Sequence, residues 1–285
     1  MQKIIAAALS PAIFPGDKER NLESAYRGLC AAKKQNVQLA LFSEWFLTHC
    51  IDERSFGVAE PVPDGPTVQA VIKFAEEFAM TIAMGVEELD PERGVVYNTH
   101  FLAGPNGYIG KHRKTHLMID EWQAHRAGST FETFDIGTAR VGISICHENM
   151  YPETSRILAL KGAEILLSPF GCGGSFEPTT NEKWQNDFHM ACWRARCLDN
   201  GVYMIVSGGN GAPENGRYKP YKSYGCIIDP FGEVVASIEP QPSDPEINLV
   251  VAELDPERVA ARRADANYPL KKRRPEIYGT ITEAY

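Results

Sequence analysis

The sequence predicts an α/β fold in which helices pack against one sheet, or against two sheets that face each other. Three observations carry this prediction. Apolar strand-like runs alternate with amphipathic helical segments early in the chain, strong hairpin signals follow, and a late run of short strands ends the series. No Ser/Gly-rich linker, charge block or repeat divides the 285 residues, so we expect a single domain over residues 1–285.

Composition and charge argue against several classes of protein. A formal net charge of −8 is not typical of a general nucleic-acid or anionic-membrane binder. No apolar run approaches the length that crosses a bilayer, and Pro11 interrupts the short apolar start before it could act as a signal peptide. The seven cysteines form neither a CxxC pair nor a disulfide framework. We therefore expect reduced thiols and a cytoplasmic protein, with neither a metal nor a cofactor.

The first part of the chain alternates strands with helices. Runs rich in Ile, Val and Leu suit buried strands, while side chains such as Leu22, Tyr26 and Leu29 recur at helical spacing. Pro66 stands at a position that favours a helix start. The expected elements are strand 4–9, helix 17–34, strand 37–42, helix 68–80 and strand 81–86.

Hairpins and further strands follow. The segment Gly104-Pro105-Asn106-Gly107 joins strands 97–103 and 108–111 in a strong hairpin signal. Strands 131–134 and 140–145 form a second pair around a glycine. The remaining expected elements are helix 152–162, strand 165–168, helix 181–199, strands 202–207, 223–228, 234–237 and 249–253, and helix 256–263.

Cys146 lies in the turn between strand 140–145 and the helix that begins at Pro152. A thiol in such a turn meets unpaired backbone N–H groups and the positive end of a helix dipole, and both favour the thiolate. The alternative is an inert buried cysteine, because cysteine is among the most buried residue types. The other residues at strand ends decide between the two.

Glu44 and Lys114 also follow predicted strands, and catalytic residues of such folds gather beyond the carboxyl ends of strands. A thiol, a carboxylate and an ammonium suit acyl transfer from an amide or a nitrile. The thiolate attacks the carbon, the carboxylate moves the proton, and the ammonium stabilises the oxyanion. A carboxylate with a raised pKa can replace histidine as the base.

These residues and their surroundings resemble the nitrilase, or carbon–nitrogen hydrolase, superfamily over essentially the whole chain. Glu44 in LALFSEWF, Lys114 in GKHRKTHL and Cys146 in GISICHENMYPE match the family's catalytic triad, and Glu121 looks like its accessory glutamate. The resemblance implies that the backbone N–H of His147 joins Lys114 in binding the oxyanion. Supporting motifs are YNT at 97–99, GST at 128–130, RCLDNGVY at 196–203, the run SYGCIIDPFGEVV from Ser223, and RRPEIY near the end.

The resemblance also implies architecture and assembly. The fold would be a four-layer α-β-β-α sandwich, with subunits paired into at least a homodimer. The segment from Trp184 to Leu198 is a plausible part of the pairing surface. A scaffold that keeps the fold without catalysis is a second class of hypothesis, which the three intact positions disfavour.

Several residues suggest alternative nucleophiles or ligand sites. Cys172 in FGCGGS also follows a strand and is the alternative nucleophile, although the family places no catalyst there. The histidines His112, His116 and His147 fit no common metal-ligand spacing. We interpret His116 as a neighbour of Lys114 in the substrate cleft. The SGGNG segment matches no standard phosphate-binding glycine pattern.

The substrate class is predicted from the residues around Cys146. His147 stands where true nitrilases typically carry Trp, and the Tyr-Pro-Glu run that follows resembles the amidase and carbamoylase branches. Met150 and Tyr151 stand where carbamoylases of N-carbamoyl-D-amino acids carry arginines, and Glu148 would repel a nearby anion. We therefore expect a linear amide, or a neutral or cationic N-carbamoyl amine, rather than a nitrile or an N-carbamoyl amino acid. Arg194 and Lys222 are candidates for a missing cation.

Overall fold

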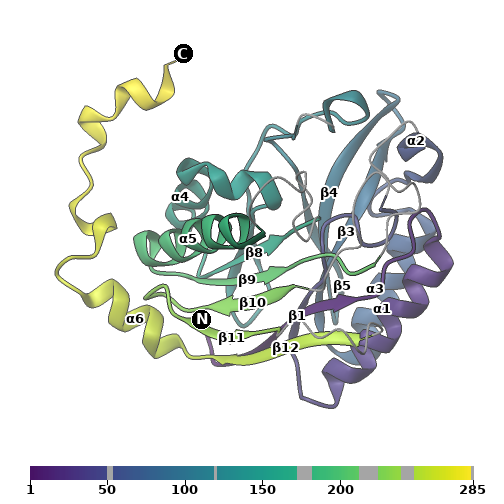
Figure 1. Ribbon diagram of the computed structural model, residues 1–285, viewed down its shortest axis with the longest axis horizontal. Coiled ribbons are helices and arrows are strands. Elements are labelled where there is room, and N and C mark those ends of the chain that lie inside the picture. Colours follow the sequence, from purple (N-terminus) through teal and green to yellow (C-terminus); the bar gives the residue numbers. More distant parts are fainter. Residues whose placement is uncertain (50–53, 119–120, 172–181, 212–223, 239–246, 284–285) are drawn as a thin grey trace.

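The computed structural model describes residues 1–49, 54–118, 121–171, 182–211, 224–238 and 247–283, with the side chains of 182–187 left aside. The runner-up nucleophile Cys172 and the candidate cation Lys222 lie outside these residues. The described residues form two mixed sheets with helices on their outer faces (Figure 1).

The first sheet has six strands in the order β12-β1-β2-β3-β4-β5. Strands β1 to β3 run parallel. Strand β12 pairs antiparallel with β1, β4 pairs antiparallel with β3, and β5 pairs antiparallel with β4. The strands are β1 (Ile4–Pro11), β2 (Leu39–Leu41), β3 (Thr81–Asp90), β4 (Val95–Gly104), β5 (Gly107–Arg113) and β12 (Ile247–Leu254).

The second sheet has six strands in the order β11-β10-β9-β8-β7-β6, and its three parallel strands are β7, β8 and β9. Strands β6 and β10 pair antiparallel at either side of them, and β11 pairs antiparallel with β10. The strands are β6 (Thr133–Asp135), β7 (Arg140–Ile143), β8 (Ile165–Pro169), β9 (Tyr203–Ser207), β10 (Gly225–Ile228) and β11 (Val234–Ser237).

Helices cover the outer face of each sheet. Helices α1 (Lys18–Lys33) and α3 (Pro66–Phe78) pack on the first sheet, and α4 (Pro152–Leu160) and α5 (Glu182–Asn200) pack on the second (Figure 1). The expected four-layer α-β-β-α sandwich is therefore confirmed. The chain also contains α2 (Ser55–Val58), α6 (Pro256–Ala264) and the 3-10 helices η1 (Glu121–Gln123), η2 (Cys146–Met150), η3 (Pro269–Lys272), η4 (Pro275–Ile277) and η5 (Gly279–Thr282).

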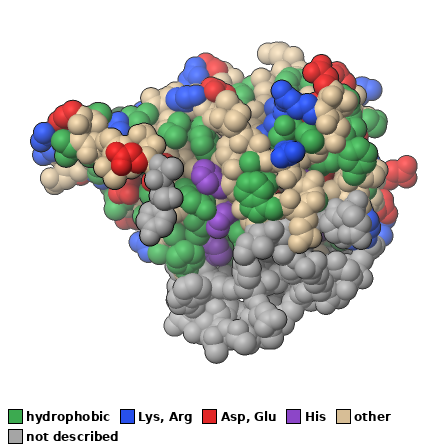
Figure 2. Space-filling view, turned by 90° about the horizontal axis from the view of Figure 1, so that it is seen from above, with side chains coloured by type: hydrophobic (Ala, Val, Ile, Leu, Met, Phe, Trp, Pro, Cys, Tyr) green, Lys and Arg blue, Asp and Glu red, His purple; other side chains and the backbone are tan. Residues whose placement is uncertain are grey.

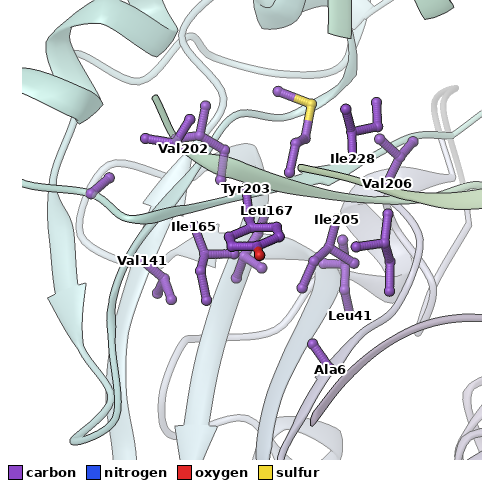
Figure 3. Close-up of a cluster of buried hydrophobic side chains, with 14 of the residues drawn as sticks. Ala6, Leu41, Val141, Ile165, Leu167, Val202, Tyr203, Ile205, Val206 and Ile228 are labelled. Carbon is purple, nitrogen blue, oxygen red and sulfur yellow. The ribbon is translucent and has the colours of Figure 1, made fainter. Parts of the chain in front are cut away.

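The buried apolar residues form two cores, and successive residues of a strand point alternately into one core and the other. In β1, Ala6 and Ala8 belong to the core shared with the second sheet, while Ala7 and Leu9 belong to the core under α1 and α3. The close-up in Figure 3 shows Ala6 and Leu41 of the first sheet beneath residues of the second, such as Ile205. A strand buried on both faces reads as a continuous apolar run, which is why residues 4–9 were recognisable.

Two buried hydroxyls join the sheets where β1 faces β9. The Oγ of Ser207 donates to the carbonyl of Leu9 at 2.6 Å, and the Oγ of Ser10 donates to the carbonyl of Gly208 at 2.7 Å. These bonds satisfy polar groups at the carboxyl ends of the two strands. They therefore fix the position of β1 relative to β9, and with it the position of one sheet relative to the other, next to the candidate site.

Most predicted elements are present, with shifted ends. The helix predicted over 68–80 spans Pro66–Phe78, because Ala79 adopts a left-handed conformation with φ 50° that ends it. The side chain of Asp17 caps α1 by accepting from the backbone N–H of Arg20. Strand β3 continues to Asp90, beyond the predicted end at 86, because it pairs with the whole of β4.

The ends of three strands place the candidate residues. Glu44 lies three residues beyond β2, Lys114 follows β5 directly, and Cys146 lies three residues beyond β7. Two of these strands belong to the first sheet and one to the second. Among the described helices, none is long and apolar enough to span a membrane.

Gly85 in β3 allows the segment that contains Glu44 to pack closely on the sheet. A Cβ at this position would lie 2.5 Å from the backbone N of Trp45 and 2.8 Å from the carbonyl oxygen of Ser43. The carbonyl of Gly85 also accepts from the backbone N–H of Leu47 at 3.0 Å. The position of Glu44 therefore depends on the absence of a Cβ at Gly85 on the neighbouring strand β3.

We expect Gly85→Ala to lower the free energy of unfolding by about 1–3 kcal/mol, because the methyl group has only backbone to displace. Urea denaturation followed by circular dichroism measures this. Gly57→Ala is the matched control, since a Cβ there meets nothing within 4 Å. Equal denaturation midpoints for the two variants would contradict the close-packing argument.

Candidate active site

The turn that carries Cys146 is irregular and tightly held. Cys146 has φ 46°, in the left-handed region, and is 8% exposed. The side-chain amide of Asn149 donates to the carbonyls of Ser144 at 3.0 Å and Cys146 at 2.9 Å, and to the Oγ of Ser168 at 2.9 Å. These bonds fix the turn on the end of β8.

The predicted effect of the following helix dipole on Cys146 is wrong. The short 3-10 helix η2 begins at Cys146, and α4 begins only at Pro152. A dipole effect falls off within the first turn, so α4 begins too late to act on the thiol. The described charge that interacts with Cys146 is instead the ammonium of Lys114.

Lys114 is held by backbone and side-chain bonds at the end of β5. Its N–H donates to the carbonyl of Asn98 at 2.8 Å, and its carbonyl accepts from the N–H of Gly128 at 2.7 Å. Its Nζ donates to Glu44 Oε1 at 2.8 Å and to Glu121 Oε2 at 2.6 Å. Glu121, which resembles the family's accessory glutamate, thus lies beside Lys114, and all three side chains are almost fully buried.

Asn98 is the member of this cluster to which the sequence analysis assigned no role. Its side-chain Nδ2 donates to Glu44 Oε1 at 2.7 Å and to Glu121 Oε1 at 2.9 Å. One amide therefore bridges two carboxylates that would otherwise repel each other. The YNT motif drew attention to this position, but only the β3–β4 register and the fold of residues 114–121 reveal where the amide points.

Two carboxylates share one ammonium in a buried site, and this arrangement shifts the pKa values of Glu44 and Lys114. Burial raises the pKa of Glu44, the negative charge of Glu121 raises it further, and Lys114 and Asn98 oppose the shift. Burial alone would lower the pKa of Lys114, but Glu44, Cys146 and Glu121 outweigh it and hold that pKa well above 10.5. The site thus combines a weakly acidic carboxyl with a permanent cation.

One oxygen of Glu44 remains available for chemistry. Oε1 accepts from Lys114 and Asn98, whereas Oε2 is buried without a hydrogen-bond partner among the described residues. Gly171 lies against it, since a Cβ there would be 2.6 Å from Oε2 and 2.7 Å from the Trp45 ring.

Aromatic and imidazole rings surround the cluster. The ring of His116 stacks on Tyr151 with centroids 4.1 Å apart, and the Nε2 of His147 lies 3.3 Å from the Tyr151 hydroxyl. Burial and the nearby ammonium of Lys114 lower the pKa of His147, so its imidazole is neutral at pH 7. Figure 2 shows histidine side chains gathered at the centre of one face of the molecule.

His125 is a further imidazole near the cluster, and the sequence analysis assigned no role to it. It is 5% exposed, its ring stacks on Trp45 with centroids 6.2 Å apart, and burial lowers its pKa to about 4. It therefore contributes a neutral ring behind Trp45 rather than a charge. In the described part of the chain, no three His, Cys, Asp or Glu side chains are arranged to hold a metal ion.

The predicted effect of Glu148 on substrate is wrong. Its side chain is fully buried and bonded to His112, so it does not face an incoming ligand. Arg194, a candidate cation for a substrate carboxylate, donates through Nε to the carbonyl of Gly232 at 2.7 Å and is engaged there. The second candidate cation lies outside the described residues.

The sequence profile of the carbon–nitrogen hydrolase family matches residues 5–264. The chain belongs to this family. It is 32% identical to a nitrilase from Pyrococcus abyssi over 98% of this chain and 99% of that protein. It is 30% identical to an (R)-stereoselective amidase from a Pseudomonas species, over 94% of this chain and 90% of that protein.

Solved structures of this hydrolase superfamily share the fold. A carbon–nitrogen hydrolase from Helicobacter pylori G27 superposes with a TM-score of 0.87 at 21% identity, covering 99% of both chains. Nit3 from Saccharomyces cerevisiae, a member of the nitrilase superfamily, superposes with a TM-score of 0.79 at 26% identity, covering 95% of this chain and 97% of that one. The sandwich is therefore the architecture of a nitrilase-superfamily hydrolase.

We expect Asn98→Ala to move the acid limb of the kcat/KM profile to higher pH. The amide favours the ionised form of Glu44, so its removal raises the pKa of that carboxyl further. A base with a higher pKa is already protonated at a higher pH, and activity is lost there as the pH falls. We expect kcat/KM at pH 7 to fall on the order of tenfold or more.

Ammonia release from an amide, followed from pH 5 to 9, measures this shift. Thr99→Ala is the control, because the Thr99 hydroxyl donates to Glu88 at 2.7 Å instead. An unshifted acid limb in Asn98→Ala, or the same shift in both variants, would show that Asn98 does not tune Glu44.

Proposed function

We propose that this carbon–nitrogen hydrolase is a cysteine-dependent amidase that cleaves a linear amide or an N-carbamoyl amine and releases ammonia. The observation that carries the proposal is the placement of the Lys114 ammonium between Glu44 and Glu121, close enough to Cys146 for their charges to interact. Those groups supply a nucleophile, a base and an oxyanion-binding cation in one buried site.

The proposed reaction begins when Glu44 takes the thiol proton and the Cys146 sulfur attacks the carbonyl carbon. The developing oxyanion accepts hydrogen bonds from the Lys114 ammonium and from the backbone N–H of His147. Glu44 then returns the proton to the amide nitrogen, the C–N bond breaks, and ammonia leaves a thioester on Cys146. Glu44 next takes a proton from water, whose oxygen attacks the thioester carbon. The C–S bond breaks, the acid leaves, and Glu44 returns its proton to the Cys146 sulfur.

The choice of an amide rests on the residues near Cys146 and on the names of relatives. Relatives at 30% and 28% identity are named an (R)-stereoselective amidase and an omega-amidase, although another is named a nitrilase. Met150 and Tyr151 cannot form a bidentate clamp on a carboxylate. Arg194 is bonded to a backbone carbonyl. These observations favour uncharged or cationic substrates over N-carbamoyl amino acids.

We expect ammonia release from aliphatic amides and N-carbamoyl amines to exceed release from nitriles and N-carbamoyl amino acids. Cys146→Ala should abolish turnover with the fold retained, because no other thiol takes part in the proposed reaction. Lys114→Ala and Glu44→Gln should each lower kcat on the order of a hundredfold or more. Mass spectrometry of the wild-type protein during turnover should detect the thioester on Cys146.

Cys30→Ala is the matched control, since Cys30 lies on α1 and takes no part in the cluster. Near wild-type turnover in Cys146→Ala would rule out the proposed nucleophile. A clear preference for nitriles or N-carbamoyl amino acids would keep the hydrolase family but overturn the substrate class.

We also propose that subunits pair through α4 and α5. These helices expose large apolar side chains: Ile157 at 37%, Leu160 at 51%, Phe188 at 41% and Leu198 at 42%. Beyond α6 the chain runs away from the body of the sandwich (Figure 1), and it exposes Ile277 and Ile281. Exposed apolar side chains on two helices that pack against each other, as α4 and α5 do, are typical of an association surface.

We expect light scattering to report at least a homodimer at micromolar concentration and a larger monomer fraction for Leu160→Asp, because a buried interfacial carboxylate has no partner. Val235→Asp is the control, since Val235 is 46% exposed on β11, away from these helices. A monomeric wild-type protein, or equal dissociation of both variants, would contradict pairing through this surface.

A further inference from the structure

A buried carboxylate lies between the two chain segments that carry Lys114 and Cys146. Glu148 belongs to η2, two residues after Cys146, and its side chain is 0% exposed. A carboxylate is rarely buried to this degree without a specific partner. The proposed reaction gives this side chain no role.

The contacts of Glu148 reach the immediate neighbours of both reactive residues. Its Oε1 accepts from the backbone N–H of Thr115 at 2.8 Å and from the Thr115 hydroxyl at 2.6 Å. Its Oε2 accepts from the backbone N–H of Ile145 at 2.6 Å. Thr115 directly follows Lys114 in the chain, and Ile145 directly precedes Cys146.

His112 completes the arrangement from the end of β5. Its Nε2 lies 3.0 Å from each oxygen of Glu148, and its ring is 3% exposed. A carboxylate oxygen next to an imidazole nitrogen accepts its proton-bearing N–H. One carboxylate is thereby bonded to β5, to the residue after the lysine and to the residue before the cysteine.

We infer that Glu148 is a positioning residue that sets the distance between the Lys114 ammonium and the Cys146 sulfur. This inference rests on the proposed roles of those two residues. Lys114 comes from the first sheet and Cys146 from the second, so a link between their segments is a link between the two halves of the sandwich. A displacement of about 1 Å in such a pair can cost on the order of a hundredfold in rate.

The site requires a carboxylate rather than an amide. Every partner of Glu148 donates a hydrogen bond, so a glutamine would turn its NH₂ group toward at least one donor. Burial alone would raise the pKa of Glu148, but His112 and the hydrogen bonds from Thr115 lower it overall, so the group is ionised. A misplaced amide would push apart the segments that the carboxylate draws together.

The same carboxylate also orients an imidazole near the site. The Thr115 hydroxyl has one hydrogen, which it donates to Glu148, so at 2.8 Å it must accept from the Nδ1–H of His116. The ring of His116, held at Nδ1 in this way, stacks on Tyr151. Loss of Glu148 would release this ring together with the Lys114 segment.

Glu88 offers a matched carboxylate without this link. It is 1% exposed and accepts from Lys111, Arg113 and Thr99, two of which flank His112 on β5. Its contacts include neither Thr115 nor Ile145 among the described bonds. Glu88→Gln therefore damages the same strand by a comparable loss of buried charge and leaves the proposed link intact.

The test compares Glu148→Gln with Glu88→Gln by two readouts. The first is the rate at which iodoacetamide alkylates Cys146 across pH, with the modified residue identified by mass spectrometry. The nearby ammonium favours the thiolate, so a displaced Lys114 moves the alkylation profile to higher pH. The second is kcat for ammonia release, which we expect to fall on the order of a hundredfold in Glu148→Gln with little change in KM.

Glu88→Gln should lower the melting temperature but keep the alkylation profile and most of the kcat. Thr115→Ser and Thr115→Val give a second series for the case in which Glu148→Gln does not fold. The serine keeps the hydroxyl and should resemble the wild type, whereas the valine should lose activity. A wild-type alkylation profile in Glu148→Gln, or in Thr115→Val if that series is needed, would overturn the inference. Because alkylation requires no substrate, this result is separable from failure of the proposed amidase reaction.

Discussion

The buried ammonium of Lys114 is the interaction on which the rest of the site depends. Removing ions from water costs several kcal/mol per ion, and such a cluster survives only where its geometry and hydrogen bonds are good. Here each partner comes from a different element: Glu44 follows β2, Lys114 follows β5, and Glu121 begins η1. The cluster therefore exists only when the first sheet is correctly assembled. Burial in that assembly, with the added charge of Glu121, raises the pKa of Glu44.

Close backbone approaches make that assembly possible. Gly85 lets the Glu44 segment rest on β3, and Gly171, after β8, approaches Oε2 of Glu44 closely. At Gly128, a Cβ would lie 2.1 Å from the carbonyl oxygen of Arg113, beside the backbone of Lys114. In each case a side chain is absent where backbone meets a reactive segment, because close packing leaves no room for even one methyl group.

The two sheets contribute unequal parts of the site. The first sheet positions Glu44, Lys114 and the amide of Asn98, while the second positions Cys146. The sheets are joined by an apolar core of small residues on β1 and by the hydroxyls of Ser10 and Ser207. At the site itself, Glu148 connects the segment after β5 to the turn after β7. A reaction that needs both sheets is sensitive to any shift between them.

The sequence by itself determined the alternation of strands and helices, and with it the placement of Glu44, Lys114 and Cys146 beyond strand ends. Local pattern sufficed because apolar periodicity and turn residues act over a few neighbours. Local pattern left the number of sheets open, and only the resemblance to a family implied two. The pairing of β1 with β12 was decided by tertiary structure, since it joins segments far apart in the chain. The direction of Glu148 belongs to the same class. Its partners Thr115 and His112 lie 33 and 36 residues away, so no local pattern could show that this carboxylate turns inward rather than toward a substrate.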